Sequence, residues 1–359
     1  MTKIALITDT HLGVRNDSLV FHENFRRSAK FFFDYLDEHK IGHCIHLGDL
    51  YDRRKYVNFV TAKVCREAFL DEIQNRRIAT YVILGNHDVY YKDTNSINAL
   101  DELVAGRYPY VGIIDKPYET ELDGCKILML PWITADNREA CLEMIKNTTA
   151  EVCMGHLELK GFTMFGNTVS DHGDDGSIFN KFDLVFTGHY HHKSSKGNIH
   201  YIGGFGEHTW ADYNDPRGFT IFDTETRQFE FVRLPYRLFH MIAYDDVKHT
   251  DIIQKIQATD YSKYKDCYLK VVCVNRTNPY AFDMLLDKLY KAQPVDISVI
   301  EDISTFSEND PDSEIDQAED TVTILDKYIT GLTLPVNTDK MKSYMRDVYT
   351  EALSVEHIE

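Results

Sequence analysis

The sequence predicts an α/β protein in which two sheets pack on each other with helices outside them, followed by a small α+β domain and a C-terminal helical tail. Three observations lead to this fold class. Short apolar runs alternate with segments of helical periodicity over the first part of the 359 residues. A second alternation of strands and helices begins near residue 237. An acidic stretch then separates this second unit from the end of the chain.

Five short apolar runs in the N-terminal part each end in residues that bind metal ions. They cover residues 4–7, 44–47, 81–84, 152–154 and 184–186. Five such coincidences suggest one sheet whose strands all deliver ligands to the same edge. In open α/β sheets the active site lies at the carboxyl ends of the strands, where these five motifs fall.

The segments between these runs have helical character. Residues 21–39 and 57–75 carry apolar side chains at three- and four-residue spacing, which is typical of amphipathic helices. Shorter helices are expected at residues 98–104 and 139–146. Further strands are expected at residues 126–131, 198–202, 218–223 and 228–234. Together with the five apolar runs, they indicate two sheets packed on each other.

The rest of the chain divides into three parts after a first domain that spans residues 1–235. Residues 236–300 predict a small second domain in the order strand, helix, strand, helix, strand, at residues 239–244, 252–258, 268–274, 281–291 and 296–300. Residues 301–320 contain nine acidic residues and neither Lys nor Arg, which predicts a flexible linker. Residues 321–359 end in an amphipathic helix at 341–353, whose apolar face packs either on its own domain or on a partner.

The charge distribution limits the possible partners without excluding DNA. The net charge is −18, but residues 1–110 hold 15 basic and 15 acidic residues and are neutral. Residues 301–359 hold 4 basic and 15 acidic residues, a net of −11, and supply most of the imbalance. Bound divalent cations would also change the local field. The composition therefore excludes only a protein that binds nucleic acid through a uniformly basic surface.

The apolar runs and the cysteines indicate a cytoplasmic protein without a membrane partner. No apolar run reaches the roughly 18 residues of a membrane span. The N-terminus enters a strand directly and leaves no room for a signal peptide. The seven cysteines form no CxxC pair, and several lie inside apolar runs. Reduced, buried thiols in a cytosolic protein are therefore expected.

The residues that follow the apolar runs form a set of metal donors. Asp9 and His11 are expected on the same side of an extended backbone, because side chains alternate along a strand. Asp49 follows a glycine that allows a sharp turn, and its two oxygens could bridge two cations. Further donors are Asn86, His156, His189 and His191. This donor set suits two divalent ions such as Mn²⁺, Fe²⁺ or Zn²⁺, and the absence of cysteine argues against structural zinc.

The order of these motifs resembles that of a known family. The chain carries, in this order, Asp9-Thr10-His11, Gly48-Asp49-Leu50-Tyr51-Asp52-Arg53, Gly85-Asn86-His87-Asp88, Gly155-His156 and Gly188-His189-Tyr190-His191. All five blocks resemble the signature of the calcineurin-like metallophosphoesterases, over about residues 1–235. The resemblance implies the two-sheet metallophosphoesterase sandwich, with Asp9, His11, Asp49 and His191 at one metal. It implies Asp49, Asn86, His156 and His189 at a second metal, with Asp49 bridging.

The same resemblance implies roles for three further residues. His87 would be the catalytic histidine, because an imidazole that titrates near neutrality can assist a leaving oxygen. Asp52 matches the position that orients this histidine in relatives with Gly-Asp-x-x-Asp, although some nuclease relatives carry His there. Arg53 matches a phosphate contact in the phosphatase branch and could equally be a surface residue.

Three features of the chain resemble SbcD-type nuclease subunits of DNA double-strand-break repair complexes. They are the blocks at residues 3–13 and 48–54, the small domain placed like a DNA-contacting capping domain, and the linker with its terminal helix. Residues 201–219 most resemble the phage recombination endonuclease subunits. In that segment His208, Trp210 and Arg217 either line the cleft or serve ordinary loop packing.

This resemblance implies a DNA exonuclease and endonuclease that uses Mn²⁺ in repair, recombination and replication. Residues 321–359 would bind an SMC-like, SbcC-type ATPase, within a heterotetramer built on a nuclease homodimer. The helices at about 57–75 and 92–104 are candidates for the homodimer interface.

Two other functions remain open on the sequence alone. A metallophosphatase for phosphoprotein or small phosphoesters shares Gly-Asp-x-x-Asp-Arg. That branch usually reads Gly-Asn-His-Glu where this chain has Gly-Asn-His-Asp, and it would leave residues 236–359 unexplained. A non-catalytic scaffold of the same fold is disfavoured by the complete donor set.

Overall fold

The structure is a computed structural model that describes residues 2–165, 168–249, 251–301, 340–342 and 345. Nearly all of the predicted acidic linker and helical tail lies outside the described residues, so both stay predictions. The described residues up to 301 belong to one compact unit. Within the described part of the chain, no helix is long and apolar enough to cross a membrane.

The first sheet has six strands in the order β14-β13-β1-β2-β3-β4. Their bounds are Phe229–Arg233, Gly218–Asp223, Lys3–Ile7, His43–His46, Ala79–Ile83 and Val111–Ile114. β1 to β4 run parallel, whereas β13 pairs antiparallel with both β1 and β14. The carboxyl ends of β1, β2 and β3 therefore lie at one edge of this sheet.

The second sheet also has six strands, in the order β11-β12-β10-β7-β6-β5. Their bounds are Ser194–Lys196, Ile199–Tyr201, Leu184–Gly188, Val152–His156, Cys125–Leu130 and Tyr118–Leu122. β12, β10, β7 and β6 run parallel, and the two outer strands are antiparallel to their neighbours. A small hairpin of β8 (Thr163–Phe165) and β9 (Thr168–Val169) and a 3₁₀ turn (η2, Gly176–Phe179) lie between β7 and β10 in the sequence.

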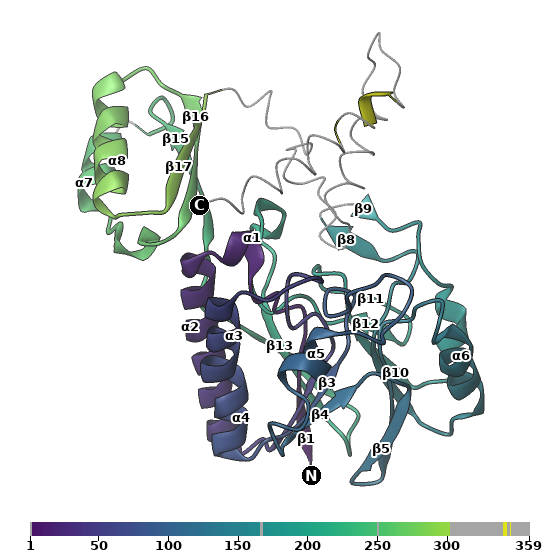
Figure 1. The fold of residues 1–359 in the computed structure, drawn as a ribbon. Coiled ribbons are helices and arrows are strands. Elements are labelled where there is room, and N and C mark those ends of the chain that lie inside the picture. Colours follow the sequence, from purple (N-terminus) through teal and green to yellow (C-terminus); the bar gives the residue numbers. More distant parts are fainter. Residues whose placement is uncertain (1, 166–167, 250, 302–339, 343–344, 346–359) are drawn as a thin grey trace. The chain divides into compact units, whose positions relative to one another are not determined.

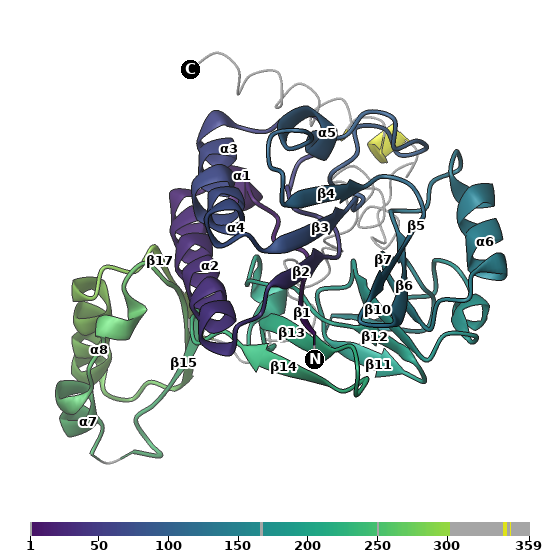
Figure 2. The ribbon, with the colours of Figure 1, turned by 90° about the horizontal axis from the view of Figure 1, so that it is seen from below.

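The two sheets share a buried apolar layer. Ile4, Leu6 and Ile83 of the first sheet form one core cluster with Met154 and Phe186 of the second, and all five are at most 1% exposed. Helices cover the other faces, with α2 (Leu19–His39), α3 (Phe59–Cys65) and α4 (Asp71–Arg76) on the first sheet and α6 (Arg138–Asn147) beside the second (Figures 1 and 2). This arrangement confirms the predicted sandwich of two sheets flanked by helices.

The expectation of a single sheet for all five motif strands was wrong. β1, β2 and β3 belong to the first sheet, whereas β7 and β10 belong to the second. The motifs still converge because the two sheets pack face to face and present the carboxyl ends of these strands to the same seam. The donors therefore come from two layers of the sandwich.

Helix boundaries differ from the expectation at two places. The segment predicted as one helix at 57–75 contains a π-helical turn (η1, Arg66–Leu70) between α3 and α4. Of the residues 92–104, only α5 (Ala99–Leu103) is helical, because the side chain of Asn98 accepts the backbone N–H of Asp101 and caps the helix there. A short turn, α1 (Val14–Asp17), was not predicted, and Arg15 and Asn16 within it have left-handed backbone angles.

The segment predicted as a small domain, residues 236–300, has the expected order of strands and helices, and its being a separate domain stays a prediction. It contains β15 (Phe239–Asp245), α7 (Ile252–Ala258), β16 (Tyr268–Asn275), α8 (Pro279–Lys291) and β17 (Asp296–Ile300), with a 3₁₀ turn (η4, Ser262–Tyr264) before β16. The three strands form a parallel sheet that packs on both helices around its own core. A separate apolar cluster of Phe21, Leu238 and Phe239 joins this domain to α2.

All seven cysteines are buried and free, as expected for reduced thiols. Their burial in the apolar layers gives them no access to the site described below.

Candidate metal centre and active site

The predicted donors converge at the seam between the two sheets. Six of them lie in the loops that follow β1, β2, β3 and β10, and His156 is the last residue of β7. Seven side chains meet there, all of them buried with at most 8% exposure: Asp9, His11, Asp49, Asn86, His156, His189 and His191. The structure thus brings together every residue that was predicted as a metal ligand.

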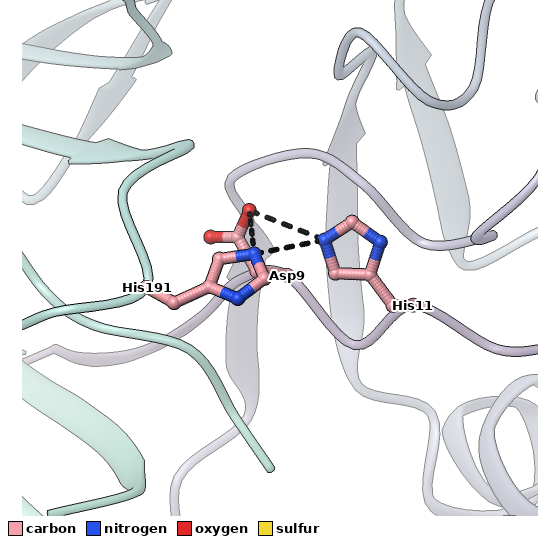
Figure 3. Close-up of side chains that lie close together, drawn as sticks. All are labelled: Asp9, His11 and His191. Atoms are coloured by element: carbon pink, nitrogen blue, oxygen red, sulfur yellow. Dashed lines mark hydrogen bonds and ion pairs between the residues drawn. The ribbon is translucent and has the colours of Figure 1, made fainter. Parts of the chain in front are cut away.

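One group of donors consists of Asp9, His11 and His191 (Figure 3). The Nε2 atoms of the two histidines lie 3.0 Å apart, and Asp9 Oδ1 lies 3.8 Å from His11 Nε2 and 3.7 Å from His191 Nε2. Three donor atoms from two sheets therefore point at one small volume.

A second group surrounds the amide of Asn86. Its Oδ1 lies 2.9 Å from His156 Nε2 and 3.0 Å from His189 Nδ1. The Oδ2 atom of Asp49 lies 3.4 Å from His156 Nε2 and 3.6 Å from His11 Nε2. The Asp49 carboxylate therefore stands between the two groups of donors.

The hydrogen bonds of His156 test whether this set suits a cation. Its Nδ1 lies 2.8 Å from the carbonyl oxygen of Leu47, which can only accept. Nδ1 therefore donates a proton there, and Nε2 is the atom turned toward Asn86 and Asp49. In metal sites, a hydrogen bond from the ring nitrogen that does not bind the metal orients the histidine ligand in this way. Oxygen and imidazole nitrogen donors that converge in a buried volume fit divalent metal ions.

The carboxylates give the site a strongly negative character. Burial lowers the pKa of His11, but the hydrogen bond to Asp52 and the charges of Asp49 and Asp9 outweigh it and raise the pKa to about 9. The pKa of His156 is likewise raised to about 9, because Asp49 and Asp9 outweigh burial. Buried carboxylates that hold positive charge so strongly on neighbouring imidazoles also attract cations.

The other two histidine donors are neutral. Burial lowers the pKa of His189 well below its usual value, and the nearby His156 adds to the effect. Burial and the nearby His11 do the same for His191. Neutral imidazole is the form that binds a metal, so these two residues need not lose a proton to act as ligands.

The backbone of the donor loops is left-handed where an extended strand was expected. β1 ends at Ile7, and the φ angles of Asp9 and His11 are 50° and 42°. The φ angles of Asp49 and His189 are 57° and 88°. The expectation that alternation along an extended chain places Asp9 and His11 was therefore wrong. Each such residue costs on the order of 1–3 kcal/mol, which persists only where the surroundings fix it.

Two glycines permit the close packing of the donor loops. A Cβ at Gly48, where φ is +107°, would lie 2.3 Å from Nδ1 of His156. A Cβ at Gly85 would lie 2.1 Å from Oδ1 of Asp49. Any side chain at either position would displace a donor, so these glycines are part of the site.

The carboxylate of Asp88 fixes the two loops to each other, a role that the sequence reasoning missed. It is fully buried and accepts backbone N–H groups from Asp49 (2.9 Å), Leu50 (3.3 Å), Tyr51 (3.1 Å) and Gly85 (2.9 Å). Burial and the charge of Asp49 raise the pKa of Asp88 to about 7, and the N–H donors oppose the rise. An acidic residue directly after Gly-Asn-His was the only sequence signal for it.

His87 is less buried than the donors and lies at their rim. Its backbone N–H donates to Oδ1 of Asp49 over 2.8 Å, and its ring packs edge-on against that of His11 with 4.8 Å between centroids. Its Nδ1 is hydrogen-bonded to the backbone carbonyl of Asp52. The carboxylate of Asp52 lies 3.4 Å from Nδ1 of His11. Asp52 therefore contacts both histidines, one through its main chain and one through its side chain.

The four residues predicted with less support as substrate contacts lie in different surroundings. His208 is buried, and its ring centroid lies 5.2 Å from that of His11 and 5.5 Å from that of His191. Arg217 is buried and bonds to the His191 carbonyl and the Asp212 carboxylate, which favours a structural role.

The other two predicted substrate contacts, Trp210 and Arg53, are more exposed. Trp210, in a 3₁₀ turn (η3, Trp210–Asp212), packs on Phe239, with Lys270 4.4 Å from its ring. Arg53 is partly exposed and bonds to Asn16 and Tyr56.

Two further residues near the donors were not predicted. The ring of Trp132 lies 5.1 Å from that of His189 and 5.9 Å from that of His156, between centroids. Its backbone N–H donates to the Leu84 carbonyl over 2.8 Å, which ties the end of β6 to the end of β3. Glu207 is buried and accepts the N–H groups of Leu238 and Phe239, which anchors β15 to the loop that carries His208. Neither residue belongs to a recognisable motif.

Comparisons with known proteins agree with this arrangement. A sequence profile of the calcineurin-like phosphoesterases matches residues 2–193. Exonuclease subunit 1 of Enterobacteria phage T4 is 31% identical over 360 residues, which cover 98% of this chain and 99% of the phage protein. The relationship therefore extends well beyond the residues that the family profile matches.

Solved structures give weaker matches. An archaeal phosphodiesterase is 16% identical, with coverage of 65% of this chain and all of that protein and a TM-score of 0.34. A dimetal phosphatase from Danio rerio is 10% identical, with coverage of 61% and 91% and a TM-score of 0.40. Similarity at this level supports no inference about activity.

We expect Asp88→Ala to destabilise the protein strongly. Four backbone N–H groups would lose their acceptor, and a buried unsatisfied group costs about 1–3 kcal/mol, so the loss should be at least ~4 kcal/mol. Thermal unfolding followed by circular dichroism measures the effect, with exposed Asp93→Ala as the control that leaves Tm within a degree or two. Equal Tm values for the two variants would contradict this role for Asp88.

Proposed function

The chain belongs to the calcineurin-like phosphoesterase family, and from this premise we propose that it is a metal-dependent DNA exonuclease and endonuclease. Membership makes it a phosphoester hydrolase. The observation that carries the choice of DNA is the relationship to a phage exonuclease subunit along 98% of the chain. A phosphatase related only through its catalytic domain would not account for the small domain and the C-terminal residues.

The donor geometry supports two divalent ions, with Mn²⁺ as the proposed metal. Asp9, His11, Asp49 and His191 would hold one ion, and Asp49, Asn86, His156 and His189 would hold the other. Asp49 Oδ2 lies within 3.6 Å of donors in both groups, which supports a bridging role. When bound, such a pair polarises the phosphate and lowers the pKa of a bound water.

His87 is the proposed catalytic histidine. Its Nδ1 contacts the Asp52 carbonyl oxygen and therefore donates there. Two contacts fix its position, the bond from its N–H to Asp49 and the edge-on packing against His11. From the rim of the site it can stabilise or protonate the leaving oxygen of a cleaved phosphodiester. Asp52 would position His87 through the main-chain carbonyl and His11 through the carboxylate.

Contacts to DNA would come from residues around this rim. His208, close to His11 and His191, and the partly exposed Arg53 are the proposed substrate contacts nearest the donors. Trp210 and Lys270 meet where the small domain adjoins the catalytic one, which supports a contact farther along the DNA. Arg217 was predicted as a fourth contact, but its buried ion pair supports a role in holding His191.

The proposed partners are a second copy of this chain and an SMC-like, SbcC-type ATPase bound through residues 321–359. Exposed apolar side chains near α3 and α5 support the homodimer: Tyr56 (53% exposed), Phe59 (93%), Tyr91 (48%) and Ile97 (46%). In this proposal the assembly acts in DNA repair, recombination and replication in the cytoplasm of a bacterial host.

The metallophosphatase and the scaffold remain the alternatives that experiment must separate. We expect the wild-type chain to cleave plasmid DNA in the presence of Mn²⁺, and His87→Ala to reduce the rate by about 10²–10⁴-fold, because a positioned proton donor is lost. Exposed His39→Ala is the matched control and should retain full activity. Turnover of p-nitrophenyl phosphate without DNA cleavage would favour the phosphatase, and inertness toward both substrates would favour the scaffold.

Metal content tests the shared role of Asp49. After dialysis against Mn²⁺, wild-type protein should hold two ions per chain by inductively coupled plasma mass spectrometry. His189→Ala should hold about one ion and Asp49→Ala fewer than one, since only the second change removes a donor from both groups. His240→Ala in the small domain is the control and should keep two. A wild-type value of one ion would overturn the two-metal assignment.

Deletion of residues 321–359 tests the proposed ATPase contact. The shortened chain should keep Mn²⁺-dependent cleavage, because every donor lies within residues 9–191. It should no longer be captured by the purified SbcC-type ATPase in a pull-down, whereas a full-length Tyr290→Ala variant should be captured normally. Retained binding after the deletion would place the contact elsewhere.

A further inference from the structure

The second group of donors contains one imidazole that lacks an orienting hydrogen bond to the protein. His189 turns its Nδ1 toward Asn86 Oδ1 over 3.0 Å, whereas its Nε2 is buried and has no hydrogen-bond partner among the residues that the structure describes. A neutral imidazole that binds a metal through Nδ1 carries its proton on Nε2. Histidine ligands usually donate this proton to an oxygen that fixes the ring, as His156 does to Leu47. Other contacts must therefore orient His189.

Aromatic rings supply these contacts. The ring of Trp132 lies 5.1 Å from that of His189 with an interplanar angle of 42°, and it lies 5.9 Å from that of His156 at 68°. Such tilted and edge-on arrangements are the ones that aromatic pairs prefer. Tyr190 also packs on His189, at 4.9 Å, but it is the next residue in the chain and moves with the same loop. Trp132 comes from the end of β6 and can fix His189 relative to a different part of the sandwich.

The position of Trp132 is itself fixed by hydrogen bonds of its main chain. Its N–H donates to the Leu84 carbonyl over 2.8 Å. Its carbonyl accepts from Nδ2 of Asn95 over 3.0 Å and from Nδ2 of Asn137 over 2.9 Å. Leu84 lies two residues before Asn86, so the indole is held to the loop that delivers the amide donor of the second group. Trp132 is therefore a rigid support for the imidazoles of this group.

The main chain and the side chain of His189 are fixed by different groups. The N–H of His189 donates to both oxygens of the Asp9 carboxylate, 3.2 Å from each, and Asp9 belongs to the first group of donors. The imidazole serves the second group and packs on Trp132. Rotation about the side-chain bonds of His189 would leave its bonds to Asp9 intact. Loss of the contact with Trp132 should therefore disturb the second group and spare the first.

We propose that Trp132 is a positioning residue that orients the His189 imidazole and thereby raises the affinity of the second group of donors for its divalent ion. The proposal rests on the two-metal site proposed above. It gives an aromatic ring the task that a hydrogen bond to Leu47 performs for His156. The affinity of the first group should not depend on Trp132.

Isothermal titration calorimetry of metal-free, full-length protein with MnCl₂ tests the proposal. Trp132→Ala should weaken one of the two ions by about 10- to 100-fold, the usual effect of losing a partner that orients a metal ligand, and leave the other within about twofold. Trp132→Phe keeps a ring at this position and should hold both ions nearly as wild type does. Trp210→Ala is the matched control, because it removes the other of the two tryptophans, and it should change neither affinity.

Two further backgrounds assign the weakened ion to a group. His11→Ala removes a donor of the first group only, and Asn86→Ala removes one of the second group only. Adding Trp132→Ala should weaken the remaining ion in the His11→Ala background and have no effect in the Asn86→Ala background. Equal weakening in both backgrounds, or none in the first, would overturn the proposal. Trp132→Leu keeps an apolar side chain without a ring and carries the same expectation, so the result does not depend on whether Trp132→Ala folds.

The Mn²⁺ dependence of hydrolysis provides a second readout, with bis(p-nitrophenyl) phosphate as the substrate. If Trp132 acts through the ion, Trp132→Ala should need more Mn²⁺ for half of the maximal rate, by the same factor as its affinity falls. At saturating Mn²⁺ it should regain the kcat of the wild type. A kcat that stays low at saturation would show that Trp132 acts elsewhere and would overturn the proposal.

The outcomes also separate this proposal from the function on which it rests. Binding of a single ion by the wild type would overturn the two-metal assignment and the role of Trp132 together. Two ions with the same affinities in wild type and Trp132→Ala would leave the two-metal assignment intact and overturn the role of Trp132 alone. Neither titration contains DNA, so the nuclease function is tested independently.

Discussion

The site depends on the position of one carboxylate, that of Asp49. Its Oδ2 lies 3.4 Å from His156 Nε2 of the second sheet and 3.6 Å from His11 Nε2 of the first. A shift of about one ångström in either sheet would separate it from one group of donors. The apolar layer between the sheets and the bonds to Asp88 both hold this position. The large apolar core between the two sheets therefore fixes the geometry of the small polar site at their seam.

The placement of the donor side chains depends on backbone conformations that are energetically unfavourable on their own. Asp9, His11, Asp49 and His189 all have positive φ angles. Neighbouring loops stabilise them, since the N–H of Asp9 donates to the Gly48 carbonyl and that of His11 to the Asp49 carbonyl. The loops thus support each other across β1 and β2. Strain of this kind concentrates at functional sites because only a rigid environment maintains it.

The two sides of the donor cluster have different surroundings. On the side of His11, the rim carries His87, with its ring anchored by the Asp52 carbonyl, and the buried His208. On the side of His156, a cavity is lined by Trp132, Glu158 and Asp174 among others. In the proposed nuclease, the side of His11 would be the one that serves proton transfer at the phosphate.

The sequence alone predicted the sandwich, most of its strands and the seven candidate donors that the structure brings together, because alternation of apolar runs and local motif spacing are one-dimensional signals. It missed β4, β5, β8, β9 and β11, which are short or lie at the edges of sheets. It could not assign the motif strands to one sheet or two, since strand pairing depends on contacts between distant residues. It placed Asp9 and His11 correctly but for the wrong conformational reason. Only the tertiary structure decided that the Asp52 carbonyl contacts His87, that Asp88 ties two loops together, and that a cavity lies beside His156. Each of these depends on where backbone atoms from separate loops meet, which no spacing along the chain encodes.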